Sequence, residues 1–552
     1  MKGPLRYLSW VLLVCLSLYS STPAGAQTAP GYRWLASGGG TGFDGGDNIA
    51  ADAAGNVYAT GIFSGTATFG SVTLTSQGDT DVYLAKYNPQ GQLLWIRPAG
   101  GPGTDTVFDL AVDDAGNAWI TGYFSSAADD PSLNPLASMI VSTVTLIGGN
   151  PFSELFLVKY SPQGALQWAR QTVGPAVSTA VKMSLDGLGN VYLIGATEQR
   201  TRFEQQYPLF TPGTTSGTFL AKYTPQGTLA WVQTGFGTLN GSAYEQVSVG
   251  AGGQMLVISY DWKIAPGHPA GGYQQTYLTN VDPAGRILWR KMLPGSDGAG
   301  TLQVRRVAVE TGGNLLLACQ FRGILHGGRN GPVFTAQGHQ DVLLLLLSPQ
   351  GDVLQGQSFS GDDPTHPDGV PGLALDAIGN RYLALTLPDA RVLPPPGRIV
   401  GTTLLCLAPD GALRWKRSGP AAVEQLSLSP KGEVLLTGGS NYAESFDDYT
   451  LSAAGFSDAF IAKLASTLPP VALSTPNIIT PNGDGLNETF RLPGLPTGPW
   501  ELRIFSRWGT LVYHTADYRQ DWTATGLPAG AYYYWLTAPG QTPLRGWVEV
   551  VR

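Results

Sequence analysis

Residues with side chains that could carry out catalysis are few in this sequence of 552 residues. Adjacent carboxylates occur in three places, as Asp129-Asp130, Asp362-Asp363 and Asp447-Asp448. Two carboxyl groups on either side of a glycosidic bond can cleave it as acid and base or as acid and nucleophile. Neighbouring acids in loops are more simply explained by solvation. We therefore interpret these pairs as solvated loop residues and keep a glycosidase or lyase pair as the alternative.

The histidines give no support for a metal or acid-base centre. There are five, scattered over predicted loops without the spacing of a zinc pair, namely His268, His326, His339, His366 and His514. No Gly-x-Ser-x-Gly elbow, phosphate loop or dinucleotide fingerprint occurs. We expect no catalytic residues and no cofactor, and favour a binding protein over an enzyme.

One segment resembles part of a calcium loop. In NGDGLN, residues 482–487, the side chains of Asn482, Asp484 and Asn487 could offer oxygen ligands. A full loop needs further acidic ligands and a bidentate Glu at its far end, which this stretch lacks. A turn rich in Asn and Asp is the favoured interpretation, so no metal site is expected and calcium is kept as the alternative.

Charge and the first residues narrow the class of protein. Lys2 and Arg6 precede an apolar run of about 13 residues, too short to span a bilayer, and the small residues Ala24-Gly25-Ala26 follow. This pattern predicts a secretory signal peptide over residues 1–26, with no transmembrane segment in the mature chain. Its removal leaves 31 basic and 40 acidic residues, a net charge of −9, which disfavours nucleic acid as a partner. Cys319 and Cys406 would then be buried free thiols.

The elements that must position any site are repeated. The chain reads YNPQGQLLW at 87–95, YSPQGALQW at 160–168 and YTPQGTLAW at 223–231. The Pro-x-Gly turn occurs six times. A second turn, of the type Asp-x-x-Gly-Asn, occurs seven times, with substitutions in some copies. Units of about 60 residues made of short alternating strands and turns predict β-hairpins assembled into propeller blades of four strands.

The phase of the repeats predicts how the ring closes. The chain enters at Trp34, the second half of a Pro-turn hairpin, and the repeats end at Leu464, its first half. If the two halves pair, no exposed sheet edge remains and seven blades result. The recurrent Trp is expected to fill the layer between blades, with sugar stacking as the alternative. The recurrent Lys is expected to snorkel or to pair between blades.

The repeat resembles a known family. DAAGNVYATGIF at 52–63 together with VYLAKYNPQGQLLW at 82–95 looks like the bacterial SBBP-type β-propeller repeat. The resemblance covers roughly residues 32–466 and implies a β-propeller, which together with the repeat count predicts a seven-bladed propeller over residues 27–466. It implies no substrate.

The last residues differ in character. A linker rich in Pro, Ser and Thr is expected at 467–475, and residues 476–552 hold enough short aromatic strands for a small immunoglobulin-like β-sandwich. They are similar to the gliding-motility-associated C-terminal domain, a type B sorting signal of the type IX secretion system in Bacteroidetes. The motif residues are Pro481, Asn482, Gly483, Asp484, Gly485, Asn487, Arg507, Trp508, Gly509, Tyr532, Tyr534 and Gly546. The resemblance implies the type IX secretion machinery as a partner.

We expect a secreted or cell-surface binding and adhesion protein that reaches the outside through the periplasm. The alternative is an extracellular hydrolase or lyase that acts on polysaccharide. Ligand recognition is expected on the length-variable connections, because strands are committed to packing. The longest connection, from Phe124 to Leu155, offers a candidate site for a glycan or protein ligand, made of Asp129, Asp130, Asn134, Asn150 and Phe152. An insertion without a role is the alternative.

Overall fold

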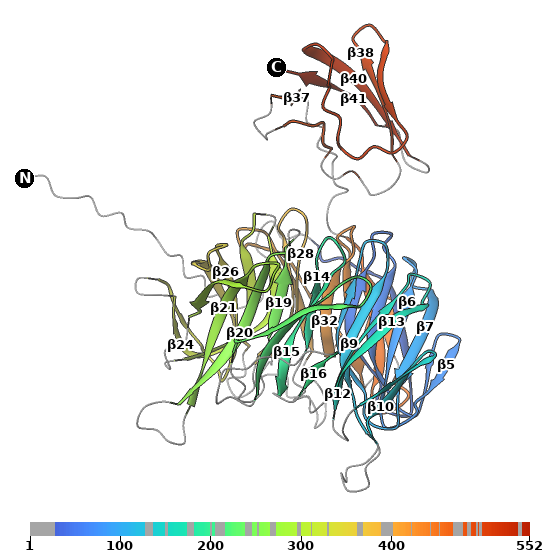
Figure 1. Ribbon diagram of the computed structural model, residues 1–552, viewed down its shortest axis with the longest axis vertical. Helices are drawn as coiled ribbons and strands as arrows, with labels where there is room; N and C mark the ends of the chain where they lie inside the picture. Colours follow the sequence, from blue (N-terminus) through green and yellow to red (C-terminus); the bar gives the residue numbers. More distant parts are fainter. Residues whose placement is uncertain are drawn as a thin grey trace, which may run out of the picture. The chain divides into compact units, whose positions relative to one another are not determined.

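The computed structural model describes most of the chain, and within the described residues every regular element is a β-strand (Figure 1). The all-β expectation is confirmed. The expected signal peptide, 1–26, and linker, 467–475, lie outside the described residues. These residues are 28–126, 136–148, 153–173, 181–198, 201–204, 216–237, 245–250, 253–264, 272–294, 300–310, 312–327, 331–361, 368–387, 401–420, 422–441, 443–451, 453–466, 478–482, 487–492, 495, 500–538 and 544–551.

The chain forms two compact units, the first ending at Ser466 and the second beginning at Thr467. In the described part of the first unit, seven antiparallel sheets each contain four strands of the repeat. The first three consist of β2 (Gly45–Ala51), β3 (Val57–Phe63), β6 (Asp81–Tyr87) and β7 (Leu93–Gly100); β8 (Thr106–Val112), β9 (Ala118–Phe124), β12 (Glu154–Tyr160) and β13 (Leu166–Val173); and β14 (Lys182–Leu185), β15 (Val191–Glu198), β17 (Ser216–Tyr223) and β18 (Leu229–Thr234).

The next three sheets repeat this order of consecutive strands. They consist of β19 (Gln246–Val249), β20 (Met255–Ile264), β21 (Gly272–Val281) and β22 (Ile287–Met292); β23 (Gly300–Val309), β24 (Leu315–His326), β26 (Asp341–Leu347) and β27 (Val353–Phe359); and β28 (Gly369–Leu375), β29 (Arg381–Thr386), β30 (Thr402–Leu407) and β31 (Leu413–Ser418). The first strand of each sheet contacts the first strand of the next sheet along the chain.

The last sheet joins the two ends of the first unit. It consists of β32 (Ala422–Leu428), β33 (Val434–Ser440), β36 (Asp458–Leu464) and, from the other end of the unit, β1 (Tyr32–Gly40). Trp34 pairs with Lys463 in this antiparallel ladder, and the Ala465 amide donates to the Gly31 carbonyl at 2.9 Å. β32 also contacts β2, which completes a cycle of contacts among the seven first strands. The expected pairing of the Trp34 strand with the last repeat is confirmed.

Several connections extend a neighbouring sheet instead of forming simple loops. β4 (Thr66–Phe69) and β5 (Val72–Thr75) add to β1, β10 (Ser138–Val141) and β11 (Val144–Ile147) add to β7, and β16 (Arg202–Phe203) adds to β13. In each case a segment that follows the second strand of one sheet pairs with the sheet before it. Smaller additions are β25 (Val333–Thr335), which pairs with β24, and the hairpin of β34 (Glu444–Phe446) and β35 (Tyr449–Leu451).

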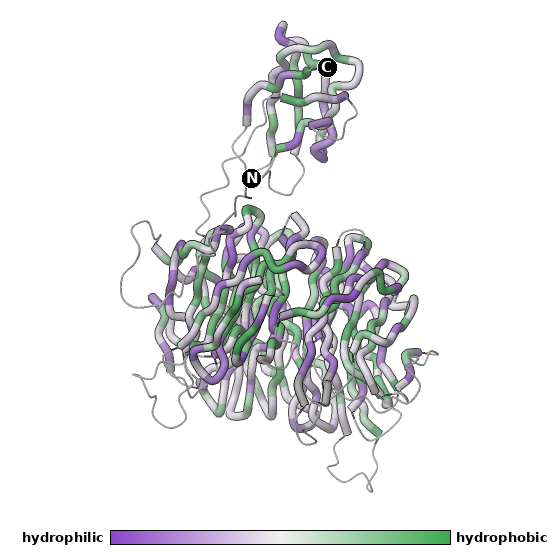
Figure 2. The backbone as a smooth tube through the Cα atoms, turned by 90° about the vertical axis from the view of Figure 1, so that its left-hand side faces the viewer, coloured by the Kyte–Doolittle hydropathy of each residue, from purple (hydrophilic) through white to green (hydrophobic). Residues whose placement is uncertain are grey.

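The core of the first unit lies between neighbouring sheets. β6 and β36 are buried at every position, because a strand with a sheet packed on each face has no side exposed to water. Buried side chains of the first two sheets, including Leu84, Ile120 and Phe156, form one continuous cluster. Hydrophobic segments, green in Figure 2, run along the strands accordingly. Cys319 and Cys406 are buried free thiols, as expected.

The described residues of the second unit form one five-stranded sheet in the order β37-β41-β40-β38-β39. Phe490 lies at the centre of its core, 5.0 Å from the Tyr534 ring and 6.2 Å from the Trp522 ring. The immunoglobulin-like sandwich stays a prediction. Of the residues described in either unit, none belongs to a helix long and apolar enough to cross a membrane. The strands are β37 (Ile478–Ile479), β38 (Glu501–Ser506), β39 (Leu511–Thr515), β40 (Gly530–Thr537) and β41 (Leu544–Val550).

Candidate functional site

The predicted ligand-binding residues on the Phe124–Leu155 connection lie outside the described residues. This applies to Asp129, Asp130, Asn134, Asn150 and Phe152. Within the Phe124–Leu155 connection, residues 136–148 are described. They contain the β10–β11 hairpin, which pairs with the preceding sheet. Recognition by this connection therefore stays a prediction.

The recurrent Trp and Lys are structural, as expected. In three junctions, both side chains donate to the carbonyl of the turn proline in the next sheet along the chain. The indole bonds are Trp34 to Pro89 at 3.1 Å, Trp95 to Pro162 at 3.1 Å and Trp168 to Pro225 at 3.0 Å. The ammonium bonds are Lys463 to Pro89 at 3.4 Å, Lys86 to Pro162 at 3.1 Å and Lys159 to Pro225 at 3.2 Å. These side chains are committed to joining sheets.

The acids of the Asp-x-x-Gly-Asn turns also have structural roles. The carboxylate of Asp52 accepts from the backbone amide of Asn56 at 2.9 Å and from its side-chain amide at 2.8 Å. The same pair of bonds fixes the turns at Asp113, Asp186 and Asp376. Such turns close each hairpin through a local side-chain bond.

Charged residues of a different kind gather on the first strands of five sheets. We call them the inner cluster: Asp47 of β2, Asp109 of β8, Lys182 of β14, Arg306 of β23 and Glu424 of β32. Lys182 lies 3.8 Å from Asp109 and donates to the Phe108 carbonyl at 2.8 Å. Arg306 donates to the backbone carbonyl of Glu424 at 3.0 Å. The cluster thus joins strands that are distant in the sequence.

Burial changes the proton affinity of the inner cluster. Burial, with the charge of Glu424, raises the pKa of Asp47 to about 7. Burial also raises the pKa of Glu424, against the opposing charge of Arg306, and lowers the pKa of Lys182. Glu424 is nevertheless exposed to water. The cluster therefore combines access to water with strong desolvation by surrounding protein.

Two atoms of the inner cluster have unused hydrogen-bonding capacity. Asp47 Oδ2 and Arg306 Nε are both buried and have no hydrogen-bond partner among the described residues. A buried polar atom without a partner costs roughly 1–3 kcal/mol, so each of these two atoms would gain from a hydrogen bond to a ligand or to water. Sequence reasoning missed this cluster. The one feature of the sequence that could have indicated this cluster is the presence of charged residues within short apolar strands, as in QVRRVAV of β23.

Buried acids also lie in pairs at the junctions between neighbouring sheets. Asp81, at the start of β6, and Asp105, before β8, lie in one junction, where the Asp105 amide donates to the Thr80 carbonyl at 2.8 Å. In the closing junction, the Asp44 amide donates in the same way to the Ser457 carbonyl at 2.9 Å. A Cβ atom on Gly39 would lie within 3.0 Å of Asp44 Oδ2 and 2.6 Å of Asp458 Oδ1, so a side chain at this position would displace the carboxylates.

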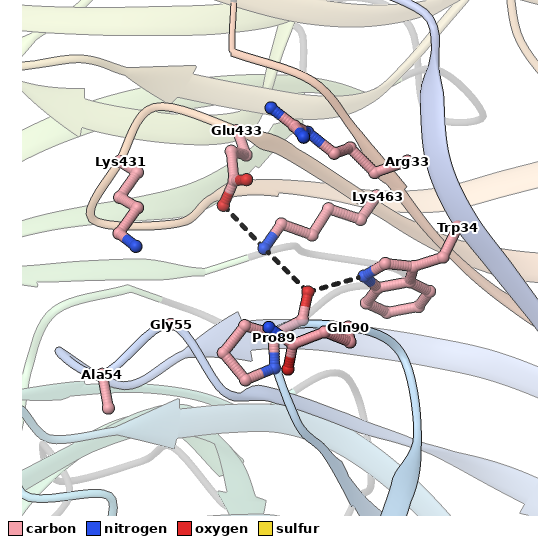
Figure 3. Close-up of a pocket in the computed structure, with 9 residues that line it drawn as sticks. All are labelled: Arg33, Trp34, Ala54, Gly55, Pro89, Gln90, Lys431, Glu433 and Lys463. Atoms are coloured by element: carbon pink, nitrogen blue, oxygen red, sulfur yellow. Dashed lines mark hydrogen bonds and ion pairs between the residues drawn. The ribbon is translucent and has the colours of Figure 1, made fainter. Parts of the chain in front are cut away.

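A pocket of about 440 Å³ lies between the last and the first sheets, among the hairpin turns (Figure 3). We call it the closure pocket. Lys463 forms an ion pair with Glu433 at 2.6 Å and shares the Pro89 carbonyl with the Trp34 indole. The lining residues are Arg33, Trp34, Ala54, Gly55, Pro89, Gln90, Lys431, Glu433 and Lys463.

The described sorting-motif residues include both buried and exposed positions. Tyr532 and Tyr534 are buried in β40, and Gly546 lies opposite Tyr534, where a Cβ atom would come within 2.4 Å of the tyrosine oxygen. In the turn between β38 and β39, Gly509 has a φ of 79°, and Trp508 is 80% exposed with the Arg507 guanidinium 5.0 Å from its ring. This turn is exposed and therefore accessible to a partner.

The loop proposed as a calcium alternative is described only at its ends. Pro481 and Asn482 precede the undescribed Gly483, Asp484 and Gly485, and the Thr480 amide donates to the Asn487 carbonyl at 2.9 Å. The arrangement of Asp484 lies outside the described residues, so calcium binding stays a prediction. Within the described ranges, no three His, Cys, Asp or Glu side chains are placed to share a metal ion.

The C-terminal unit has a recognisable family. Residues 473–550 match the CHU_C type IX secretion signal domain. This match indicates export by the type IX secretion system to the cell surface or the extracellular space, and therefore an interaction with that machinery.

Other likenesses are distant. An uncharacterized WD repeat-containing protein of Acanthamoeba polyphaga mimivirus is 24% identical over 251 residues, which is 41% of this chain but 18% of that protein. A solved protein of unknown function from Dyadobacter fermentans is 12% identical and covers 80% of this chain and 100% of its own, with a TM-score of 0.34. One from Bacteroides caccae is also 12% identical and covers 60% and 94%, with a TM-score of 0.28.

Proposed function

We propose that this chain is an exported binding and adhesion protein in which the seven sheets of the first unit are the blades of a β-propeller. The cycle of contacts among the first strands and the pairing of β1 with β36 support this architecture. A ring of blades holds the residues of its innermost strands in fixed positions around the axis. Such a scaffold suits recognition of a ligand.

The inner cluster is the proposed site of binding. The observation that carries this proposal is the pair of buried atoms without partners, Asp47 Oδ2 and Arg306 Nε. A ligand hydroxyl can donate to the first and accept from the second, so a ligand with many hydroxyl groups satisfies both. We therefore propose a glycan as the ligand.

Export can be tested by deletion of residues 471–552. The truncated protein should fold and accumulate in the periplasm, because the matched domain is the export signal. Fractionation of cells with immunodetection measures the outcome, and a periplasmic marker protein controls for leakage. Equal amounts of the truncated and full-length proteins outside the cell would refute this assignment.

Binding can be tested with a panel of soluble glycans and the full-length secreted protein. We expect Asp47→Asn and Arg306→Gln to weaken binding about tenfold or more, as each removes a charged hydrogen bond. Asp352→Asn is the control, because Asp352 is exposed in the turn between β26 and β27. Unchanged affinity in both variants, with the thermal unfolding profile intact, would exclude the inner cluster.

An extracellular glycosidase is the second candidate, and one observation favours it. Asp47, with a pKa raised to about 7, lies within electrostatic reach of Glu424, and carboxyl groups with separated pKa values can serve as acid and base. The same glycans should then release reducing ends, and Asp47→Asn should abolish this release. Binding without released products supports the binding protein and rejects the glycosidase.

A further inference from the structure

The closure pocket carries an excess of positive charge. Arg33, Lys431 and Lys463 line it with a single acid, Glu433, whereas the whole chain has a net charge of −7. Glu433 is paired with Lys463 at 2.6 Å. The side chains of Arg33 and Lys431 are exposed, and neither has a hydrogen-bond or ion-pair partner in the described part of the chain. Two cations are therefore available to a ligand.

Arg33 and Lys431 occur together only in this junction: Arg414 precedes the recurrent Trp415 of the sixth repeat, but no other copy of the turn has a lysine before its glycine. The residue before the recurrent Trp is Arg33 here, but Leu94, Gln167 and Ala230 in the next three repeats. The residue before the turn glycine is Lys431 here, but Ala54, Ala115 and Leu188 in the first three. Since uncharged residues serve the same turns and strands, the fold does not require Arg33 or Lys431.

The closing repeat also changes how its lysine is held. In the first sheet, Lys86 lies 3.5 Å from Asp52, the first residue of the turn. In the closing sheet, Ser429 takes the place of that acid, and Lys463 instead pairs with Glu433 at the end of the turn. Lys463 therefore pairs with Glu433, the acid of this junction. The positive charges of Arg33 and Lys431 remain uncompensated.

We propose that the closure pocket binds the anionic group, carboxylate or sulfate, of an acidic saccharide. Arg33 can bind such a group through two parallel hydrogen bonds, and Lys431 adds a second positive charge. The volume of about 440 Å³ lies in the range of small-ligand sites. The Gln90 amide, also on the pocket wall, can donate to and accept from sugar hydroxyls. This site is separate from the inner cluster.

Calorimetric titration of the full-length secreted protein tests the proposal. The probes are a galacturonate trisaccharide, a sulfated carrageenan oligosaccharide of similar length and a neutral cello-oligosaccharide. We expect at least one anionic probe to bind and the neutral probe to bind at least about tenfold more weakly. The anionic probe that binds identifies the group, carboxylate or sulfate. The double variant Arg33→Gln/Lys431→Gln should reduce this affinity at least about tenfold.

The matched control is Arg322→Gln/Lys416→Gln, which removes the same charge from exposed residues outside the pocket. It should bind within about twofold of the unchanged protein, because distant surface charges act weakly through solvent. Three results would overturn the proposal: no binding of either anion, equal binding of the neutral probe, or equal losses in the two double variants. Asp47→Asn should leave this binding unchanged, which separates the pocket from the inner cluster.

Discussion

Asp81 and Asp105 form a buried acidic pair across the junction between the first two sheets, with side chains only 1% and 0% exposed. Burial, together with the charge of Asp81, raises the pKa of Asp105 to about 8, and burial raises the pKa of Asp81 to about 6. The pair therefore retains protons where ordinary carboxyl groups are ionised.

Stability should fall as the pH rises through the range of this pair. The folded pKa values lie above those of the unfolded chain, so the folded state binds protons more tightly. The stabilising contribution is complete below about pH 4 and is lost as the pH rises through about 6 to 8. Thermal unfolding followed by circular dichroism should show a lower Tm at about pH 9 than at about pH 5.

Asp105→Asn should make the Tm less sensitive to pH in this range, because the amide does not ionise. Other buried acids, among them Asp47, keep part of the dependence. Asp352→Asn serves as the exposed control and should follow the unchanged protein. A profile of Asp105→Asn that is parallel to that of the unchanged protein would contradict the assignment.

Trp34→Ala should weaken the closing junction. The ring is 7% exposed, and its removal should lower the free energy of unfolding by about 3–5 kcal/mol, as for other buried aromatics. Leu94→Ala, at a position 52% exposed, should change it by less than about 0.5 kcal/mol. Urea unfolding gives both values. Similar losses in the two variants would argue that Trp34 does not stabilise the closing junction.

Gly91→Ala should cost more than Gly65→Ala. Both glycines have positive φ, 86° and 60°, so each substitution adds backbone strain of about 1–2 kcal/mol. At Gly91 a Cβ atom would also lie 2.6 Å from the Trp34 ring, whereas at Gly65 nothing lies within 4 Å. A comparison of urea midpoints measures the difference. Equal midpoints would mean that the ring moves aside without cost.

Trp508→Ala should reduce export and leave the second unit folded. The side chain is 80% exposed, so its loss should change stability by no more than about 0.5 kcal/mol. Exposed aromatics are frequent anchors of protein interfaces, and this one belongs to the predicted sorting motif. The ratio of extracellular to periplasmic protein is the measurement, with Arg519→Ala as the exposed control. An unchanged ratio would remove Trp508 from the export signal.

Features encoded locally were predictable from the sequence. The turn around Pro89 and the strand that ends in Lys463 recur with fixed spacing, so their common role in joining sheets could be inferred from one copy. The pairing of the Trp34 strand with the last repeat followed from the phase of the repeats. In both cases the residues that make the determining interactions belong to short segments that recur in the sequence.

Features that arise from contacts between different repeats were not predictable. Asp47 and Glu424 are more than 370 positions apart in the chain, and their common position in the repeat also holds Phe108 and Arg305, so no recurrent residue type marked it as a site. The β10–β11 hairpin also escaped prediction, because its partner, Ala99, belongs to the preceding repeat. Short polar-apolar alternation indicates a strand but does not specify which sheet it joins.

The position of β36 has a mechanical consequence. This strand is hydrogen-bonded on one side to β33 and on the other to β1, and the chain leaves the first unit two residues after Leu464. A pull on the C-terminal unit while a ligand holds the first unit would act along β36, across hydrogen bonds that lie perpendicular to the strand. The bonds of two ladders would then bear the load together in shear instead of opening one at a time.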